Sequence, residues 1–279
     1  IRIAHPNVER IDLEPDPHIP ELSKFMGKSY LLPAPVLPVK LFSSMALPTP
    51  MSTVQTSLPL AFAVYDASGE EVMWKSLGCL PRDHALLLKV DDMLTDKPSG
   101  ILSSGYGHME LIYDFREGGE ADGWLHSLFR YEDRKCGHAA ETSFGAHIFN
   151  TVLTYRNEPQ SYGGRAPGLS TRLFLRVGSS PADTMCHLIY PASTPWHKKS
   201  NTDLILYNAQ GDEIVCKTVT IPCGGSLLWR YSEMFSEAER NDAGEHAYLI
   251  VREVTCRLFG YHGLIGSKTA FSLDHMFGF

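Results

Sequence analysis

The chain has 279 residues, of which 43% are hydrophobic and 20% are charged, so it contains enough apolar material for one or two ordinary globular cores. Its 32 acidic residues exceed its 25 basic residues, and the net charge of −7 argues against nucleic acid or an anionic membrane as the main partner. No apolar run approaches the ~20 residues that a membrane-spanning helix needs, so no membrane partner is expected.

The first 56 residues are rich in proline. Nine prolines occur there, including Pro15, Pro17, Pro20, Pro33, Pro35, Pro38, Pro48 and Pro50. Because proline has no N–H to donate to a neighbouring strand, residues 1–56 are predicted to form an extended arm that lies over the rest of the protein. The apolar stretch 31–39 should be buried against the body or against a partner subunit, and a homodimer joined through the arm would satisfy the second case.

Residues 57–156 and 169–279 are predicted to be two copies of one domain. The stretch 62–72 (FAVYDASGEEV) aligns with 204–214 (LILYNAQGDEI), and four further blocks follow in the same order. One of these blocks aligns Tyr131 with Tyr261. An internal repeat of this length indicates a duplicated structural unit.

Each copy has the pattern of short β-strands joined by tight turns. The turns at 66–69 and 208–211 combine Asp or Asn with Gly, which are residues that accept left-handed backbone geometry. Runs of Val, Ile, Leu and aromatic residues flank these turns, and no stretch shows a sustained helical period. The predicted fold class is therefore all-β, with tandem duplicated antiparallel β-sandwich domains and a proline-rich N-terminal arm.

Residues 157–168 separate the two copies and contain several Gly and Pro residues, so they are predicted to be a linker. The functional alternative is a cradle for an anionic ligand, in which glycine N–H groups act together with Arg165 and Arg172. This stretch lacks the spacing of a phosphate-binding loop, so the linker is the favoured interpretation.

The six cysteines show no paired spacing, and four of them lie in or beside apolar strand segments. They are interpreted as small buried hydrophobic residues of a protein in a reducing compartment, which predicts a cytoplasmic location.

Standard catalytic and nucleotide-binding motifs are absent, and the chemistry-bearing residues that remain are twelve histidines with their polar neighbours. The densest polar cluster spans 136–147 and includes His138, Glu141 and His147. Imidazole and carboxylate groups are zinc-type ligands. A divalent metal such as zinc is therefore one predicted cofactor, with His138, His147 and His275 as its ligands.

Two pairs of histidines align between the copies, namely His108 with His246 and His147 with His275. If the copies packed about a pseudo-twofold axis, equivalent residues near that axis would approach each other and two imidazoles could share a metal. The alternative is that duplicated histidines serve only the fold that both copies share.

Four residues are the candidates for catalysis: His147, His262, His275 and Glu141. His262 lies between glycines, where the backbone could approach a ligand closely. Asp274 precedes His275 as a potential acid–base partner, although neighbouring residues of a strand are expected to point to opposite faces. His126 and His187 complete the polar residues expected near a cleft between the copies.

Three functional classes follow. The first is a metal-binding protein or metal-dependent enzyme whose site lies between the two lobes, a common place for a ligand. The alternative is a non-catalytic module that binds a small molecule, a carbohydrate or a protein, with Trp196 as an aromatic contact. The third class is a structural or assembly protein. The sequence leaves open whether the protein is an enzyme.

Overall fold

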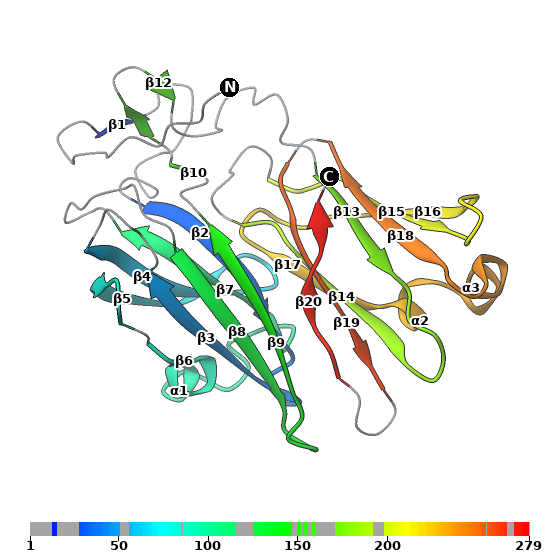
Figure 1. The fold of residues 1–279 in the computed structure, drawn as a ribbon, viewed down its shortest axis with the longest axis horizontal. Coiled ribbons are helices and arrows are strands. Elements are labelled where there is room, and N and C mark those ends of the chain that lie inside the picture. Colours follow the sequence, from blue (N-terminus) through cyan, green and yellow to red (C-terminus); the bar gives the residue numbers. More distant parts are fainter. Residues whose placement is uncertain are drawn as a thin grey trace.

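A computed structural model describes the chain over residues 13–15, 28–50, 56–84, 86–114, 125–146, 150–151, 153–155, 158–159, 171–191, 198–254, 256–266 and 271–278. The strands of these residues form two lobes that lie side by side (Figure 1). A small three-stranded sheet has the order β1-β11-β12 and comprises β1 (Leu13–Pro15), β11 (Leu153–Tyr155) and β12 (Glu158–Pro159).

The first lobe, called lobe 1, contains two antiparallel sheets. The sheet ordered β10-β2-β7-β4-β5 is built from β10 (Asn150–Thr151), β2 (Lys28–Val36), β7 (Gly107–Asp114), β4 (Ser57–Asp66) and β5 (Glu71–Pro81). The sheet ordered β6-β3-β8-β9 is built from β6 (Leu88–Lys89), β3 (Phe42–Pro50), β8 (Leu125–Asp133) and β9 (Ala139–Ala146). A short helix, α1 (Val90–Leu94), follows β6 directly.

The second lobe, called lobe 2, has the same construction. Its sheet ordered β16-β15-β18-β13-β21 is built from β16 (Glu213–Val219), β15 (Thr202–Tyr207), β18 (Tyr248–Glu253), β13 (Thr171–Arg176) and β21 (Phe277–Gly278). Its other sheet, ordered β17-β14-β19-β20, is built from β17 (Ser226–Arg230), β14 (Asp183–Ile189), β19 (Phe259–Ile265) and β20 (Asp274–His275). Helices α2 (Tyr231–Met234) and α3 (Glu237–Ala243) follow β17.

The predicted duplicated, all-β fold is confirmed by strand order. The order β2-β7-β4-β5 in lobe 1 matches β13-β18-β15-β16 in lobe 2, and β6-β3-β8-β9 matches β17-β14-β19-β20. Matching positions have matching neighbours: Tyr65 stacks on His108 with ring centroids 5.2 Å apart, and Tyr207 stacks on Tyr248 at the same separation. No helix among the described residues is long and apolar enough to cross a membrane.

Strand register corrects the alignment of the duplicated histidines. Tyr65 lies opposite His108, whereas Tyr207 lies opposite Tyr248, so the structural counterpart of His108 is Tyr248 rather than His246. His246 lies on the surface with a positive φ of 67°.

The aligned tyrosines Tyr131 and Tyr261 do not occupy matching positions. Tyr131 shares a face of β8 with Leu125 and Phe129 and points into the interior of lobe 1. Tyr261 points out of lobe 2 toward lobe 1, because its neighbour Gly260 faces Leu173 and Met276 inside lobe 2. His275 lies opposite Tyr261, and His147 lies outside the described residues, so the second histidine pair stays a prediction.

Part of the predicted N-terminal arm is instead part of lobe 1. Within residues 1–56, the strands β2 and β3 pair along most of their length with β7 and β8. Pro33 and Pro35 are two apart, so their backbone nitrogens point to the same side of β2. On the side of β2 away from β7, pairing among the described residues is limited to Ser29 and Tyr30, so prolines at 33 and 35 on that side break no described strand pairing.

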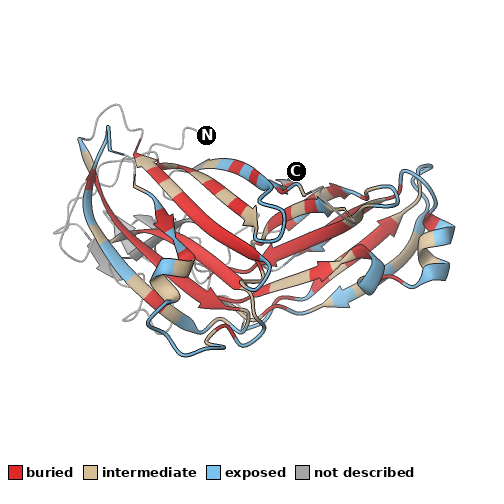
Figure 2. Ribbon diagram, turned by 90° about the horizontal axis from the view of Figure 1, so that it is seen from below, coloured by how far each residue is buried: buried red, intermediate tan, exposed pale blue. Residues whose placement is uncertain are grey.

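Buried apolar residues fill the interior of each sandwich (Figure 2). The larger apolar cluster is not confined to lobe 1, because Met185, Ile189, Tyr261 and Leu273 of lobe 2 belong to it. These residues come from β14, β19 and the segment before β20, and β14 and β19 contact β2. The face of lobe 2 formed by β17, β14 and β19 is thus packed on β2 and β7 of lobe 1, and this contact is called the junction.

A buried hydrogen bond crosses the junction, from the Tyr261 hydroxyl to the carbonyl oxygen of Pro33 at 2.7 Å. Tyr131 of lobe 1 is also fully buried, but its hydroxyl has no hydrogen-bond partner among the described residues. Tyr131 is therefore a control for Tyr261 that lacks the hydrogen bond.

We expect Tyr261→Phe to lower the free energy of unfolding by about 1 kcal/mol, because it removes a buried hydrogen bond and leaves the Pro33 carbonyl without this donor. Tyr131→Phe should leave stability unchanged or raise it, since it removes a buried hydroxyl without a partner. Urea unfolding of both variants and the wild type measures the difference. Equal losses in the two variants would contradict the assigned role of the Tyr261 hydroxyl.

Candidate functional site

A groove of about 890 Å³ lies at one end of lobe 1. Three parts of the chain form its walls: the β2–β3 turn at 38–41, helix α1, and the segment 95–105 that leads from α1 toward β7. Arg134 closes it from the β8–β9 turn. A volume of this size is typical of a site for a small molecule.

Arg134 is held in place by three hydrogen bonds. Its backbone N–H donates to the carbonyl of Leu41 at 2.9 Å, and its Nε donates to the carbonyl of Val39 at 2.9 Å. A terminal guanidinium nitrogen donates to Oδ1 of Asp91 at 2.6 Å, while Oδ2 of Asp91 accepts from Ser43 at 2.6 Å. The guanidinium is thus positioned before any ligand arrives, and its side chain remains 41% exposed.

The charge of the lining is positive, in contrast to the net negative charge of the chain. Lys40, Lys97 and Arg134 carry positive charge, and Asp91 is the one acidic residue among the described residues of the lining. Both Asp91 oxygens already accept hydrogen bonds. The remaining walls combine hydroxyl groups with apolar side chains, including Leu41, which is 50% exposed.

The segment 95–105 is tied to the rest of lobe 1 through Asp66. Oδ2 of this buried carboxylate accepts from the Ser103 hydroxyl at 2.9 Å. Oδ1 accepts from the backbone and hydroxyl of Ser68 at 2.9 and 2.6 Å and from the Glu70 N–H at 3.0 Å. Burial alone would raise the pKa of Asp66, but these hydrogen bonds outweigh burial, and the pKa lies below its ordinary value.

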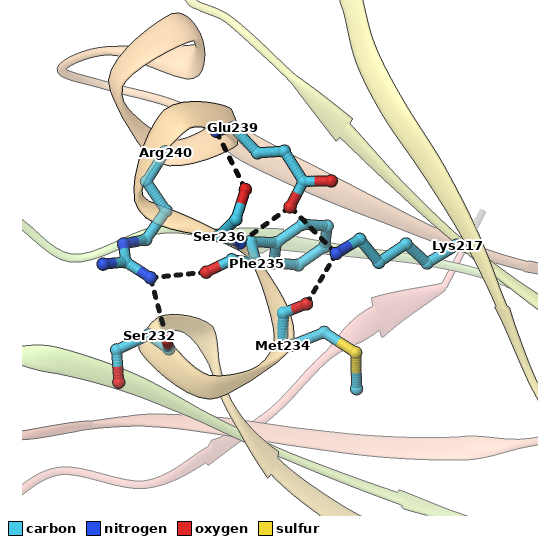
Figure 3. Close-up of polar contacts among 7 residues, drawn as sticks. All are labelled: Lys217, Ser232, Met234, Phe235, Ser236, Glu239 and Arg240. Carbon is cyan, nitrogen blue, oxygen red and sulfur yellow. Dashed lines mark hydrogen bonds and ion pairs between the residues drawn. The ribbon is translucent and has the colours of Figure 1, made fainter.

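The matching segment of lobe 2 has a different structure, because it contains α3 (Figure 3). Ser236 caps this helix, and Glu239 accepts from the Ser236 N–H at 2.7 Å and from Lys217 Nζ at 2.8 Å. Arg240 donates to the carbonyls of Ser232 and Phe235. A helix fixed by its own contacts thus stands where lobe 1 has the segment that borders the groove.

Asp274, His275 and His262, which the sequence offered as site candidates, lie together at the edge of the junction. Thr142 of lobe 1 donates to Oδ1 of Asp274 at 2.8 Å, and Nδ1 of His275 lies 3.1 Å from the same oxygen. Asp274 and His275 therefore interact, although they are neighbours on a strand and were expected to point to opposite faces. His262 lies opposite Asp274, and burial, opposed by the nearby Asp274, lowers its pKa below the ordinary value.

The other predicted residues are dispersed or lie outside the described residues. Glu141 forms an exposed ion pair with Arg130 at 2.5 Å, and His138 is exposed in the β8–β9 turn. Arg172 is exposed on β13. His147, Arg165 and Trp196 lie outside the described residues.

No three His, Cys, Asp or Glu side chains among the described residues are placed to hold a metal ion. The predicted metal ligands His138 and His275 lie on different parts of the protein: the first is exposed in the β8–β9 turn, and the second pairs with β19 of lobe 2. The described part of the chain thus gives no support to the predicted zinc site.

Sequence reasoning missed the groove and a buried pair in β7. The groove has no motif because its walls come from distant segments. The buried pair, His108 and Glu110, did leave a signal: the two residues are two apart in an apolar strand and therefore share one face.

No family model matches the chain, and no curated protein sequence matches it. Among solved structures, the apo form of a Pleurotus ostreatus lectin is similar at 10% identity over 91% of this chain and 78% of the lectin, with a TM-score of 0.18. A TM-score this low does not establish a shared fold, and nothing about a ligand of this chain follows from it.

We expect Asp66→Asn to lower the free energy of unfolding at pH 7 by about 1–2 kcal/mol, because an amide replaces a carboxylate that accepts four hydrogen bonds. Since folding lowers the pKa of Asp66, the stability that this residue supplies is present above the unfolded-state pKa and is lost as the pH falls through the lower folded-state value. The difference between wild type and variant should therefore shrink below about pH 4.

Urea unfolding from pH 3 to 7 measures this prediction. Ser103→Ala removes the tie to segment 95–105 but leaves the turn, so it should show a smaller loss than Asp66→Asn. A difference between wild type and Asp66→Asn that is independent of pH would contradict the assigned role of the carboxylate.

Proposed function

We propose that this chain is a non-catalytic binding protein and that its ligand is a small carboxylated molecule, such as an acidic sugar, held in the groove of lobe 1. The observation that carries the proposal is Arg134, whose guanidinium is fixed by Asp91 and Val39 at the wall of a groove of suitable size. A guanidinium matches a carboxylate in shape and charge.

The rest of the lining supports the same ligand class. Lys40 and Lys97 add positive charge, which attracts an anion and disfavours a cation. Hydroxyl groups of Thr95, Ser99 and Ser104 can bond to the hydroxyls of a sugar, while Leu41 offers an apolar contact.

Binding without catalysis is supported by the composition of the lining. The described residues that line the groove include no His, Cys or Glu, and the carboxylate of Asp91 is already engaged by Arg134 and Ser43. A nucleophile with an adjacent base, which covalent catalysis requires, is therefore not available from these residues.

Glucuronate and glucose provide matched probes, since they differ only in the carboxylate. Calorimetry or ligand-observed NMR should show that glucuronate binds more tightly than glucose. Arg134→Ala should weaken glucuronate binding roughly 10- to 100-fold, because it removes a charge-assisted hydrogen bond. Lys40→Ala and Lys97→Ala should each weaken it by a smaller factor, since both lysines are exposed.

Arg176→Ala is the control, since this exposed arginine lies in lobe 2 and contacts His246. It should leave binding unchanged. Equal binding of the two sugars, or unchanged glucuronate binding by Arg134→Ala, would rule out the groove as a carboxylate site.

A second candidate function is a metal-binding or catalytic site at the edge of the junction. The observation that favours it is the contact of Asp274 with His275 and with Thr142 of the other lobe. An aspartate next to an imidazole can orient a general base or a zinc ligand. Such a metal site would need a further ligand, for which His147 is the candidate from sequence.

Under this second function, purified protein should retain stoichiometric zinc after dialysis, and His275→Ala should lose it. Elemental analysis of the wild type and of this variant decides the matter. His84→Ala, which changes an exposed histidine of the turn after β5, should retain the metal. Wild-type protein that binds no zinc would remove this candidate without affecting the groove.

A further inference from the structure

Buried polar atoms without partners are concentrated at the junction. Among the described residues, seven buried side-chain nitrogen or oxygen atoms have no hydrogen-bond partner. Five of these belong to residues at the junction: His108 Nδ1, Glu110 Oε2, both ring nitrogens of His187, and Ser226 Oγ. Because native proteins leave few such atoms unpaired, a concentration in one place calls for an explanation.

His187 is the centre of this cluster. It lies in β14 of lobe 2, is fully buried, and meets the edge of the Tyr106 ring of lobe 1 at a centroid separation of 5.6 Å. Across the junction, His108 and Glu110 of β7 are fully buried, with Nε2 and Oε1 3.0 Å apart. Tyr65 of β4 stacks on the His108 ring.

The cluster is compatible with a neutral His187 and not with a charged one. Burial, together with the nearby His108, lowers the pKa of His187 to about 3. No side chain accepts a hydrogen bond from either ring nitrogen, so a positive charge there would be buried without a partner.

The groups that face His187 offer it little compensation. On its own sheet, Leu228 of β17 and Tyr261 of β19 lie opposite it, and the hydroxyl of Tyr261 already donates to Pro33. From lobe 1, Oε1 of Glu110 is engaged by His108, and Oε2 of Glu110 forms no hydrogen bond with His187. Arg230 lies two residues beyond Leu228 on β17 and would add a like charge.

We propose that His187, with the His108–Glu110 pair, makes the junction an acid-sensitive latch between the two lobes. At neutral pH the uncharged ring is buried against lobe 1 and the latch is closed. Protonation of His187 places an unpaired charge in the buried contact, and the junction opens while the interior of each sandwich keeps its packing.

The direction of the pH dependence follows from linkage. When the junction opens, water reaches His187 and its pKa returns toward the ordinary value near 6.5. The closed state binds the proton less well than the open state. It is therefore fully favoured above a pH of about 6.5 and loses stability as the pH falls toward 3. The opening equilibrium should shift up to tenfold per pH unit for one proton.

Hydrogen exchange of the full chain measures the opening. Protection factors, corrected for the intrinsic effect of pH, should fall between pH 7.5 and 4.5 for amides of β14 and β7. Those of β16, the outermost strand of lobe 2, should stay constant. His187→Phe removes the titrating ring but keeps an aromatic contact for Tyr106, so its protection factors at the junction should be independent of pH. His138→Gln changes an exposed histidine and should behave as wild type.

Several results would overturn the proposal. Wild-type protection at the junction could remain constant down to pH 4.5, or all strands could lose protection together. The pH dependence could also persist in His187→Phe and vanish in Glu110→Gln, which would assign it to the carboxylate. If His187→Phe does not fold, the imidazole resonances of wild-type His187 decide. An ordinary titration near pH 6.5 without loss of protection at the junction would refute the latch.

Discussion

The packing of β14 and β19 on β2 and β7 is the contact on which the rest of the structure depends. It joins the apolar interior of lobe 1 to Met185, Ile189 and Tyr261 of lobe 2, so the lobes share one continuous cluster. Apolar residues of one lobe would face water if the other were absent, which costs about 25 cal/mol for each Å² exposed. The two copies are thus coupled halves of a single structure.

The junction is asymmetric, and this asymmetry explains why equivalent residues have diverged. Lobe 1 contributes β2 and β7 to it, whereas lobe 2 contributes β14, β17 and β19, and these are not equivalent strands. A residue buried at the junction in one copy therefore has a counterpart in a different environment. His108, for example, is buried against lobe 2, whereas its counterpart Tyr248 of β18 is half-buried and stacks on Tyr207. A pseudo-twofold arrangement, which would bring equivalent residues together, is not what the chain adopts.

Sequence reasoning could reach the duplication and the strand content because both are local patterns that repeat. It could not assign β2 and β3 to the sheets, because prolines normally exclude a strand. A strand tolerates proline where the neighbouring strand on the proline's side has already ended. Pro48 and Pro50 of β3 are examples, because they lie beyond the pairing of β6 with Met45 and Ala46. The candidate site was out of reach for a related reason. The guanidinium of Arg134 is positioned by Val39 and Asp91, which are distant from it in sequence.

The segments after α1 and α2 show how the two copies of one fold differ locally. In lobe 2, Ser236, Lys217 and Glu239 fix α3 by hydrogen bonds, and the segment is satisfied by its own contacts. In lobe 1 the matching segment contains no helix and is tied to the body through Asp66 and Ser103, which leaves its polar groups beside an open groove. The groove is therefore best understood as a feature of the difference between the lobes, not of the sandwich that they share.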